Sequence, residues 1–500
     1  MIYTVPHYIN GRAVQEKSGP ELPIYNPALG ERIGNITIAS PTSCELAIQA
    51  AKDAWVSWST TSPSKRAQIL FKFRELLEKH QLDLARMVTR EHGKTIDDAK
   101  GSVARAIELV DLHCGLVTQL QGTVSMNVTH QVDCYTIRQP LGVCFGVSPF
   151  NFPIMVPVWM MIPAIAAGNT FILKPSEQDP SAPVRVMELL TDAGLPAGVV
   201  NCIQGDKSTV DYFLTHPDIM TCTAVASTPV AEHIYKTATA YGKRSHTFGG
   251  AKNHCVLMPD ADMDYAAQAI VGAGYGAAGE RCMAISVVVA VGEETADQLI
   301  DKLIPLVSKI KINAGDVNGT DMGPLVSQVH RSRVLQAIEN GVAEGARLII
   351  DGRDYTHPNY PNGYFVGPCL FDNVTDDMSI YQQEIFGPAL VIMRVPTFDA
   401  AIELVNRHQY GNGTAIFTRD GFAAREYAQR VQVGMVGINI PIPVPIASHP
   451  FGGWKRSAFG DMGMHGMDSI RFYTKSKTIT SKWPVTEFGE AGFSMPTHSD

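Results

Sequence analysis

The sequence predicts an α/β protein with a doubly wound parallel sheet, a second α/β unit and a small β element outside both. Apolar runs of strand length alternate with helical patterns in residues 141–250, and the alternation repeats in residues 250–435. Strands that alternate with helices form parallel sheets covered by helices. Residues 123–139 and 469–480 instead alternate polar and apolar side chains, which is typical of strands with one face in water.

Length and composition indicate a soluble protein without a nucleic-acid or membrane partner. The 500 residues, 45% of them hydrophobic, are enough for two or three domains. A formal charge of -8 argues against nucleic-acid binding, and no apolar stretch suits a signal peptide or a membrane span. The nine cysteines include no CxxC pair, which is typical of a reducing compartment. We therefore expect a cytoplasmic location.

The first part of the chain opens with turns and continues with helices. A hairpin is expected at residues 8–12 and a turn at residues 26–30. Arg105 falls within the last helix of this part, where its plainest interpretation is a solvated helix face. Helical periodicity is present in residues 43–58, 64–77, 82–91 and 96–116.

The two alternating segments, residues 123–139 and 469–480, are expected to lie outside the main sheets. They would pair with each other or with a neighbouring subunit, because an exposed strand edge usually needs cover. An ordinary edge strand within the chain is the competing interpretation, and alternation alone does not choose. The two segments favour a homodimer or a homotetramer.

The first parallel sheet is expected to bind a ligand at the carboxyl ends of its strands. Polar turns follow three of these strands, at residues 148–153, 174–177 and 226–229. The predicted strands are residues 143–147, 170–173, 199–203, 223–226 and 246–248, and the helices between them are residues 154–167, 182–193, 209–214 and 230–240.

Lys174 and Glu177 are a lysine and a carboxylate three residues apart at such a strand end, where they would grip the two hydroxyls of a ribose. The carboxylate would also repel a ribose 2'-phosphate, which favours NAD over NADP. The GxGxxG motif that usually marks dinucleotide binding is absent, so the prediction of NAD binding has no support from it. A capping pair at a helix start explains the same two residues equally well.

Cys282 follows a small-residue approach, residues 276–279, and precedes an apolar run at residues 287–291 that predicts a buried strand. The thiol would then lie at the mouth of a strand, where a substrate can reach it. The adjacent Arg281 would favour the thiolate electrostatically. A small buried hydrophobe is the alternative for any lone cysteine.

Glu384 begins the motif Glu-Ile-Phe-Gly-Pro, ahead of a strand predicted at residues 389–395. It would be a general base, a ribose ligand or a solvated residue at the start of a strand. Further along the chain, Pro441, Pro443 and Pro445 are regularly spaced, which predicts a rigid wall rather than a mobile lid.

Five motifs, taken together and in this order, resemble the aldehyde dehydrogenase superfamily over nearly the whole chain. They are Ser-Pro-Phe-Asn-Phe-Pro at 148–153, Lys-Pro-Ser-Glu at 174–177, Gly249-Gly250, Cys282, and Glu-Ile-Phe-Gly-Pro at 384–388. Finer motifs resemble one branch of it, the CoA-acylating methylmalonate-semialdehyde dehydrogenases. These are residues 249–254, 279–284, 439–445 and 471–474.

The resemblance implies an aldehyde dehydrogenase-like fold with NAD as cofactor. Residues 1–122 and 141–249 would be the NAD-binding domain, and residues 250–435 the catalytic domain. Residues 436–468 would return to the NAD-binding domain. Residues 123–140 and 469–500 would form oligomerisation strands and a tail.

The resemblance also assigns roles to individual residues. Cys282 would attack an aldehyde carbonyl and carry a thioester after hydride leaves for NAD. The side-chain amide of Asn151 and the backbone N–H of Cys282 would hold the oxyanion. The implied cofactor contacts are Lys174 and Glu177 on the adenosine ribose, Ser227 on the pyrophosphate, Glu384 and Phe386 on the nicotinamide ribose and ring, and Phe150.

Thr247 departs from the hydrolytic members of the superfamily, which carry a glutamate two residues before the paired glycines. Threonine is no general base near neutral pH, so attack of water on the thioester should be slow. The thiol of coenzyme A is the expected acceptor, as a cosubstrate. The alternatives are a non-acylating enzyme that uses another base and a catalytically silent relative with a binding role.

Arg105 and Arg281 match arginines that hold a substrate carboxylate in this branch. Two guanidinium groups bind a carboxylate through planar hydrogen bonds, which a simple aliphatic aldehyde would not need. The expected substrate is malonate semialdehyde or its 2-methyl form, with acetyl-CoA or propionyl-CoA as product after loss of carbon dioxide.

Three residues depart from the family pattern. Ala226 and Ala231 stand where glycines are common, and an added methyl group there would weaken NAD binding or be absorbed by the turn. Residues 447–450, which include His449, replace a more aromatic segment of the branch. We expect a surface loop residue there, and the alternative is a lining residue of the substrate tunnel.

Overall fold

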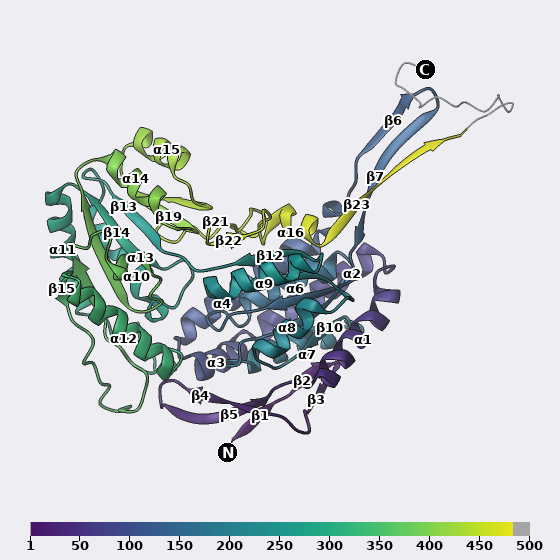
Figure 1. The fold of residues 1–500 in the computed structure, drawn as a ribbon, viewed down its shortest axis with the longest axis horizontal. Helices are drawn as coiled ribbons and strands as arrows, with labels where there is room; N and C mark the ends of the chain where they lie inside the picture. Colours follow the sequence, from purple (N-terminus) through teal and green to yellow (C-terminus); the bar gives the residue numbers. More distant parts are fainter. Residues whose placement is uncertain (1, 484–500) are drawn as a thin grey trace.

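The structure is a computed structural model and describes residues 2–483. Two large sheets covered by helices form the body of the molecule, and a three-stranded sheet projects from it (Figure 1). The α/β architecture predicted from the sequence is confirmed. Within the described range, no helix combines the length and the apolar character needed to cross a membrane.

The first large sheet has the strand order β22-β12-β11-β8-β9-β10-β2-β3. Its central strands, from β12 to β10, are parallel, and antiparallel strands lie at both edges. All strands predicted for residues 141–250 are present. The strands are β2 (His7–Ile9), β3 (Arg12–Val14), β8 (Val143–Val147), β9 (Thr170–Lys174), β10 (Val200–Cys202), β11 (Ile219–Val225), β12 (Arg244–Phe248) and β22 (Ala458–Phe459).

Successive residues of β8 enter different hydrophobic cores, which is why helices cover both faces of this sheet. Cys144 packs in the core that contains α6, and Phe145 packs in the core that contains α1 and α8. The helices are α1 (Pro41–Trp58), α2 (Pro63–Lys79), α3 (Gln81–His92), α4 (Ile96–Cys114), α5 (Leu116–Gln119), α6 (Met155–Ala166), α7 (Ser181–Asp192), α8 (Lys207–Thr215) and α9 (Thr228–Ala240).

The second large sheet has the order β15-β16-β17-β14-β13-β19-β20 and is parallel except at β15. Its central strand β14 follows directly on the cysteine loop. The strands are β13 (Asn253–Leu257), β14 (Ile285–Val291), β15 (Arg347–Ile350), β16 (Cys369–Asp372), β17 (Ala389–Val395), β19 (Gly413–Phe417) and β20 (Met435–Ile438). The helices are α10 (Met263–Tyr275), η1 (Gly276–Gly279), α11 (Glu293–Val307), α12 (Gln328–Ala343), α13 (Ser379–Gln382), α14 (Phe398–Arg407) and α15 (Gly421–Arg430).

The projecting sheet, at the upper right of Figure 1, contains β6 (Val124–Thr129), β7 (Val132–Pro140) and β23 (Thr474–Lys482) in the order β23-β7-β6. The two alternating segments therefore pair with each other, which confirms one of the two pairings predicted from the sequence. Residues 484–500 of the predicted tail lie outside the described range.

Two details of the projecting sheet differ from the prediction. Residues 123–139 form a hairpin rather than one strand, because Gln131 adopts a left-handed φ of 60° and reverses the chain. Residues 469–472 belong to a short helix, α16 (Gly466–Phe472), which buries Ile470 and Phe472. The polar and apolar residues alternate at residues 469–472, which gave this segment its strand-like pattern, although Ser469 is buried as well as Ile470 and Phe472.

Small elements complete the fold. A three-stranded sheet joins β1 (Tyr3–Val5), β5 (Glu31–Thr37) and β4 (Glu21–Asn26), and β18 (Tyr410–Gly411) pairs with β21 (Trp454–Lys455). The predicted hairpin at residues 8–12 and turn at residues 26–30 are confirmed. The boundaries of the domains stay a prediction.

Candidate active site

Cys282 lies at the mouth of β14, as the sequence predicted, and its side chain is partly exposed. A left-handed turn brings the chain there, since Ala277, Ala278 and Gly279 all have positive φ values. At Gly279 the turn approaches the carbonyl oxygen of Gly387 so closely that an added Cβ would clash with it. Glycine is therefore required at this position to bring the cysteine loop against residues 384–388.

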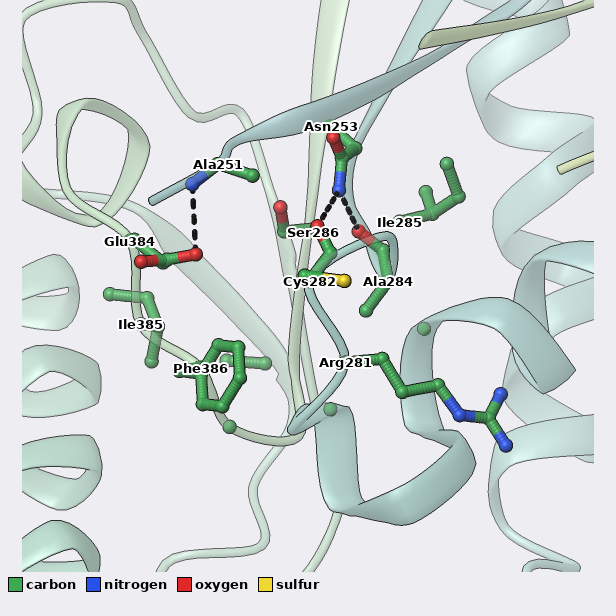
Figure 2. A pocket seen from close by; sticks show the side chains of 14 residues that line it. Ala251, Asn253, Arg281, Cys282, Ala284, Ile285, Ser286, Glu384, Ile385 and Phe386 are labelled. Atoms are coloured by element: carbon green, nitrogen blue, oxygen red, sulfur yellow. Dashed lines mark hydrogen bonds between the residues drawn. The ribbon is translucent and has the colours of Figure 1, made fainter. Parts of the chain in front are cut away.

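Two asparagines that sequence reasoning missed hold the backbone of the cysteine. Asn253 Nδ2 donates to the carbonyl oxygens of Cys282 and Ala284, both at 2.9 Å (Figure 2). Asn412 Nδ2 donates to the same Cys282 oxygen at 3.0 Å. The signal for Asn253 was a polar side chain at the start of a buried strand. Nothing in the sequence around Asn412 marks it.

Two features of its surroundings raise the pKa of the Cys282 thiol. Burial, followed by the nearby carboxylate of Glu384, raises the pKa of Cys282 to about 12. The expectation that Arg281 favours the thiolate is wrong, because the Arg281 guanidinium pairs with Asp98 and extends away from the sulfur in Figure 2.

Asn151 lies beside the cysteine loop, in the turn that follows β8. Its buried side-chain amide donates to the backbone carbonyl oxygen of Glu280 at 3.1 Å. Amide nitrogens carry two hydrogens, so one donor remains for a second acceptor. The structure thus brings Asn151 to the loop of the nucleophile, and its role as an oxyanion donor stays a prediction.

Glu384 and Phe386 line the same pocket as Cys282 and Arg281 (Figure 2). Glu384 Oε1 accepts the backbone N–H of Ala251 at 2.9 Å, and burial raises the pKa of Glu384 to about 7. Among the alternatives, a freely solvated residue at a strand start is excluded. The Phe386 ring meets the ring of Phe150 edge to face, with centroids 5.7 Å apart.

Lys252 is a further residue that sequence reasoning missed. Its buried Nζ donates to the carbonyl oxygens of Ile380 and Gln383, at 2.7 and 2.9 Å. These bonds hold the segment that carries Glu384. Burial lowers the pKa of Lys252 to about 7.

Lys174, Glu177 and Ser227 lie at the carboxyl ends of β9 and β11, apart from the cysteine pocket. Lys174 Nζ bonds Glu177 Oε2 at 2.8 Å. Helix α7 begins only at Ser181 and has no side-chain cap, so the capping alternative for this pair is wrong. Ser227 is the N-cap of α9, yet its hydroxyl makes no capping hydrogen bond.

The two arginines are each held by a carboxylate of α4. Arg281 pairs with Asp98, and Arg105 Nη1 lies 2.6 Å from Glu108 Oε2. Arg105 Nη2 also donates to the carbonyl oxygens of Val444 and Pro445, in the proline-rich loop, at 2.9 and 3.2 Å. Arg105 is therefore no freely solvated helix residue, although no contact in the structure shows a ligand role.

The side chain of Thr247 faces helix α9 and not the cysteine pocket, whereas His449 lies in a surface loop. Thr247 is fully buried, and its hydroxyl donates to the carbonyl oxygen of Ala231 at 2.9 Å. His449 is exposed in a loop, where its Nδ1 lies 3.1 Å from the hydroxyl of Ser448. The surface interpretation of His449 fits this placement.

Two α/β sheets, a partly exposed cysteine in one pocket with a partly exposed glutamate, and a side-chain amide on the cysteine loop are the features of a dehydrogenase that acts through a thiol. The model of the aldehyde dehydrogenase family matches residues 14–479. The chain belongs to the aldehyde dehydrogenase family, and the resemblance inferred from its motifs is confirmed.

Several relatives within the family are similar to this chain over nearly its whole length. Malonate-semialdehyde dehydrogenase of Pseudomonas aeruginosa is 50% identical over 495 residues, 99% of either chain. A crystal structure from Sinorhizobium meliloti 1021, provisionally named methylmalonate-semialdehyde dehydrogenase and complexed with NAD, is 51% identical with a TM-score of 0.96, over 97% of this chain and 99% of that one. Methylmalonate-semialdehyde dehydrogenase of Oceanimonas doudoroffii is 48% identical with the same TM-score and the same coverage.

Proposed function

We propose that this protein is an NAD-dependent, CoA-acylating dehydrogenase of malonate semialdehyde or methylmalonate semialdehyde. Acetyl-CoA or propionyl-CoA is the product after loss of carbon dioxide. The observation that carries the acylating half of the proposal is the absence of a basic group at the end of β12. Thr247 has no basic group, and its hydroxyl is bonded to Ala231 of α9, on the face of the sheet away from Cys282. The next residue, Phe248, packs in the core that Cys282 contacts and is apolar. Water therefore lacks an activating base from this strand, whereas a thiol is the better nucleophile without one.

The residues at the strand ends fit NAD. The Lys174–Glu177 pair presents an ammonium group and a carboxylate to a ribose, and the uncommitted Ser227 hydroxyl lies at the N-terminus of α9, which favours a pyrophosphate. Gly250 leaves a space beside Glu384, since an added Cβ would lie 2.5 Å from Oε2. Glu384, Phe386 and Phe150 would hold the nicotinamide end. The chemistry that NAD supplies when bound is acceptance of a hydride.

Each remaining step of the proposed reaction is assigned to residues of this chain. Cys282, as thiolate, bonds to the aldehyde carbon of the substrate, and the aldehyde oxygen becomes an oxyanion. The free N–H of Asn151 and the backbone N–H of Cys282 stabilise that charge. Loss of hydride leaves a thioester on Cys282, which the CoA thiolate cleaves so that the Cys282 sulfur leaves. Arg105 and Arg281 bind the carboxylate of the substrate.

The deciding experiment measures NADH formation from malonate semialdehyde with and without coenzyme A. We expect steady turnover only with coenzyme A, and one equivalent of NADH per active site without it. Steady turnover without coenzyme A would show a non-acylating enzyme that uses another base. Absence of any NADH burst, with NAD still bound, would show a catalytically silent relative.

The proposal also covers the assembly and the location of the protein, on the basis of the projecting sheet and the cysteines. The projecting sheet leaves the edge of β6 uncovered, with Val124 and Met126 exposed, so a second subunit would cover it in a homodimer or homotetramer. All nine cysteines are free thiols, which supports a reducing, cytoplasmic location. The domain division at residues 122, 141, 249 and 435 is part of this proposal.

A further inference from the structure

Asp98 is bound on both sides by cations. Its Oδ2 lies 2.9 Å from Lys94 Nζ, and its Oδ1 accepts a hydrogen bond from Arg281 Nη2. The Lys94 side chain is fully buried, and its Nζ lies 4.2 Å from the centre of the Phe152 ring, next to Asn151. Burial alone would raise the pKa of Asp98, but Lys94 and then Arg281 outweigh it, so the pKa lies below its ordinary value. Asp98 therefore stays an anion between two positive groups.

The guanidinium of Arg281 fits a space shaped by Gly276. A Cβ at Gly276 would clash with Nη1 of Arg281, so the glycine leaves room that the guanidinium fills. Asp98 engages only Nη2, and the structure of residues 2–483 shows no acceptor for Nε or Nη1. Arg281 is thus fixed by one hydrogen bond while other donors remain for a second carboxylate.

Helix α4 carries the anchor of Arg281 and also carries Arg105. Asp98 and Arg105 are about two helical turns apart, which places them on the same face of α4. The helix begins with a side-chain cap, because Thr95 Oγ1 accepts the backbone N–H of Asp98 at 3.2 Å. One capped helix therefore sets the positions of both arginines.

Arg281 shares the carboxylate of Asp98 with Lys94. A carboxylate of the substrate would pair with the unused donors of Arg281 in a largely desolvated place, where such pairing is stronger than in water. Uncharged aldehydes offer no such gain.

We infer that Asp98 is a positioning residue that holds Arg281 to receive the carboxylate of the substrate, and thereby helps to select carboxylated aldehydes. The inference rests on the proposed function. Asp98 acts through Arg281 and not on the reacting atoms. A merely structural ion pair would instead support stability, and its loss would affect all substrates alike.

The test compares Asp98→Asn with Asp97→Asn, a neighbouring exposed carboxylate of the same helix. Steady-state kinetics are measured for malonate semialdehyde and for uncharged propanal. In Asp98→Asn we expect KM for malonate semialdehyde to rise about tenfold, KM for propanal to change less than about twofold, and kcat at saturation to be retained. Asp98→Glu should restore most of the affinity, and Asp97→Asn should match the wild type.

Two further variants keep the inference testable if Asp98→Asn folds poorly. Gly276→Ala displaces the guanidinium without touching Asp98 and should raise KM for malonate semialdehyde selectively. In an Arg281→Met background, Asp98→Asn should add no further rise, because its effect passes through Arg281.

The outcomes separate the two proposals. No CoA-dependent turnover of malonate semialdehyde by the wild type contradicts the proposed function itself. Wild-type turnover with an unchanged KM in Asp98→Asn and Gly276→Ala overturns only the role of Asp98. Equal losses on both aldehydes overturn it as well, in favour of a structural ion pair.

Discussion

Asn151 donates its side-chain amide to the backbone carbonyl oxygen of Glu280, two residues before the nucleophile, at 3.1 Å. The bond ties the turn after β8 to the cysteine loop, and it leaves one amide hydrogen unused. The first large sheet thereby supplies a side-chain amide that holds the loop of Cys282, which leads into the second sheet.

Replacement of Asn151 by Ala is expected to lower kcat about a hundred- to a thousandfold, because a fixed oxyanion donor is lost. NADH formation at saturating malonate semialdehyde and coenzyme A measures the loss. NAD affinity and thermal unfolding of the same variant show whether the fold is intact. If a well-folded variant keeps kcat within about threefold of the wild type, Asn151 does not hold the oxyanion.

NAD affinity is expected to increase with pH, because Glu384 binds ribose hydroxyls best as a carboxylate and its pKa is raised to about 7. The ionised fraction of such a group rises about tenfold from about pH 6 to about pH 8. A titration of NAD binding followed by protein fluorescence should show a similar gain over that range. Glu384→Gln should bind NAD more weakly and lose the pH dependence. A variant with the wild-type pH dependence would show that another group titrates.

Phe248→Glu is expected to produce steady NADH formation without coenzyme A, at least about tenfold above the wild-type background, because Phe248 packs in the core that Cys282 contacts and a buried carboxylate with a raised pKa is a competent base. The control is Thr247→Val on the opposite face of β12, which keeps the shape of the side chain and removes its hydroxyl. This control should remain dependent on coenzyme A, with a modest loss of stability from the missing bond to Ala231. Turnover by Thr247→Val without coenzyme A would argue that threonine itself restrains hydrolysis.

Gly279→Ala is expected to reduce both stability and kcat. Gly279 has a φ of 77°, and an added Cβ would clash with the carbonyl oxygen of Gly387, so the cysteine loop must shift. The expected loss of stability is about 1–3 kcal/mol, measured by denaturant unfolding. Gly272→Ala in α10 is the control, because its Cβ would meet nothing within 4 Å and alanine favours a helix. Equal behaviour of the two variants would contradict the constraint at Gly279.

The motifs at strand ends were the most predictable part of the site. Buried parallel strands are short apolar runs, so the carboxyl ends of β8, β9 and β11 and the start of β17 could be located in the sequence. The residues near these points are Asn151, Lys174, Ser227 and Glu384. The hairpin of β6 and β7 was not predictable in this way, because polar turn residues continue the alternation of the strands.

The sequence by itself determined the α/β class, the family, the cysteine at the mouth of a strand and the absence of a glutamate at Thr247. These depend on local order along the chain, which short-range periodicity and motifs record. Only the tertiary structure decided the partners of Arg281 and Cys282: Asp98, and the amides of Asn253 and Asn412. Such contacts join residues far apart in the chain: neighbouring strands of the second sheet bring the two asparagines to Cys282, and helix α4 brings Asp98 to Arg281.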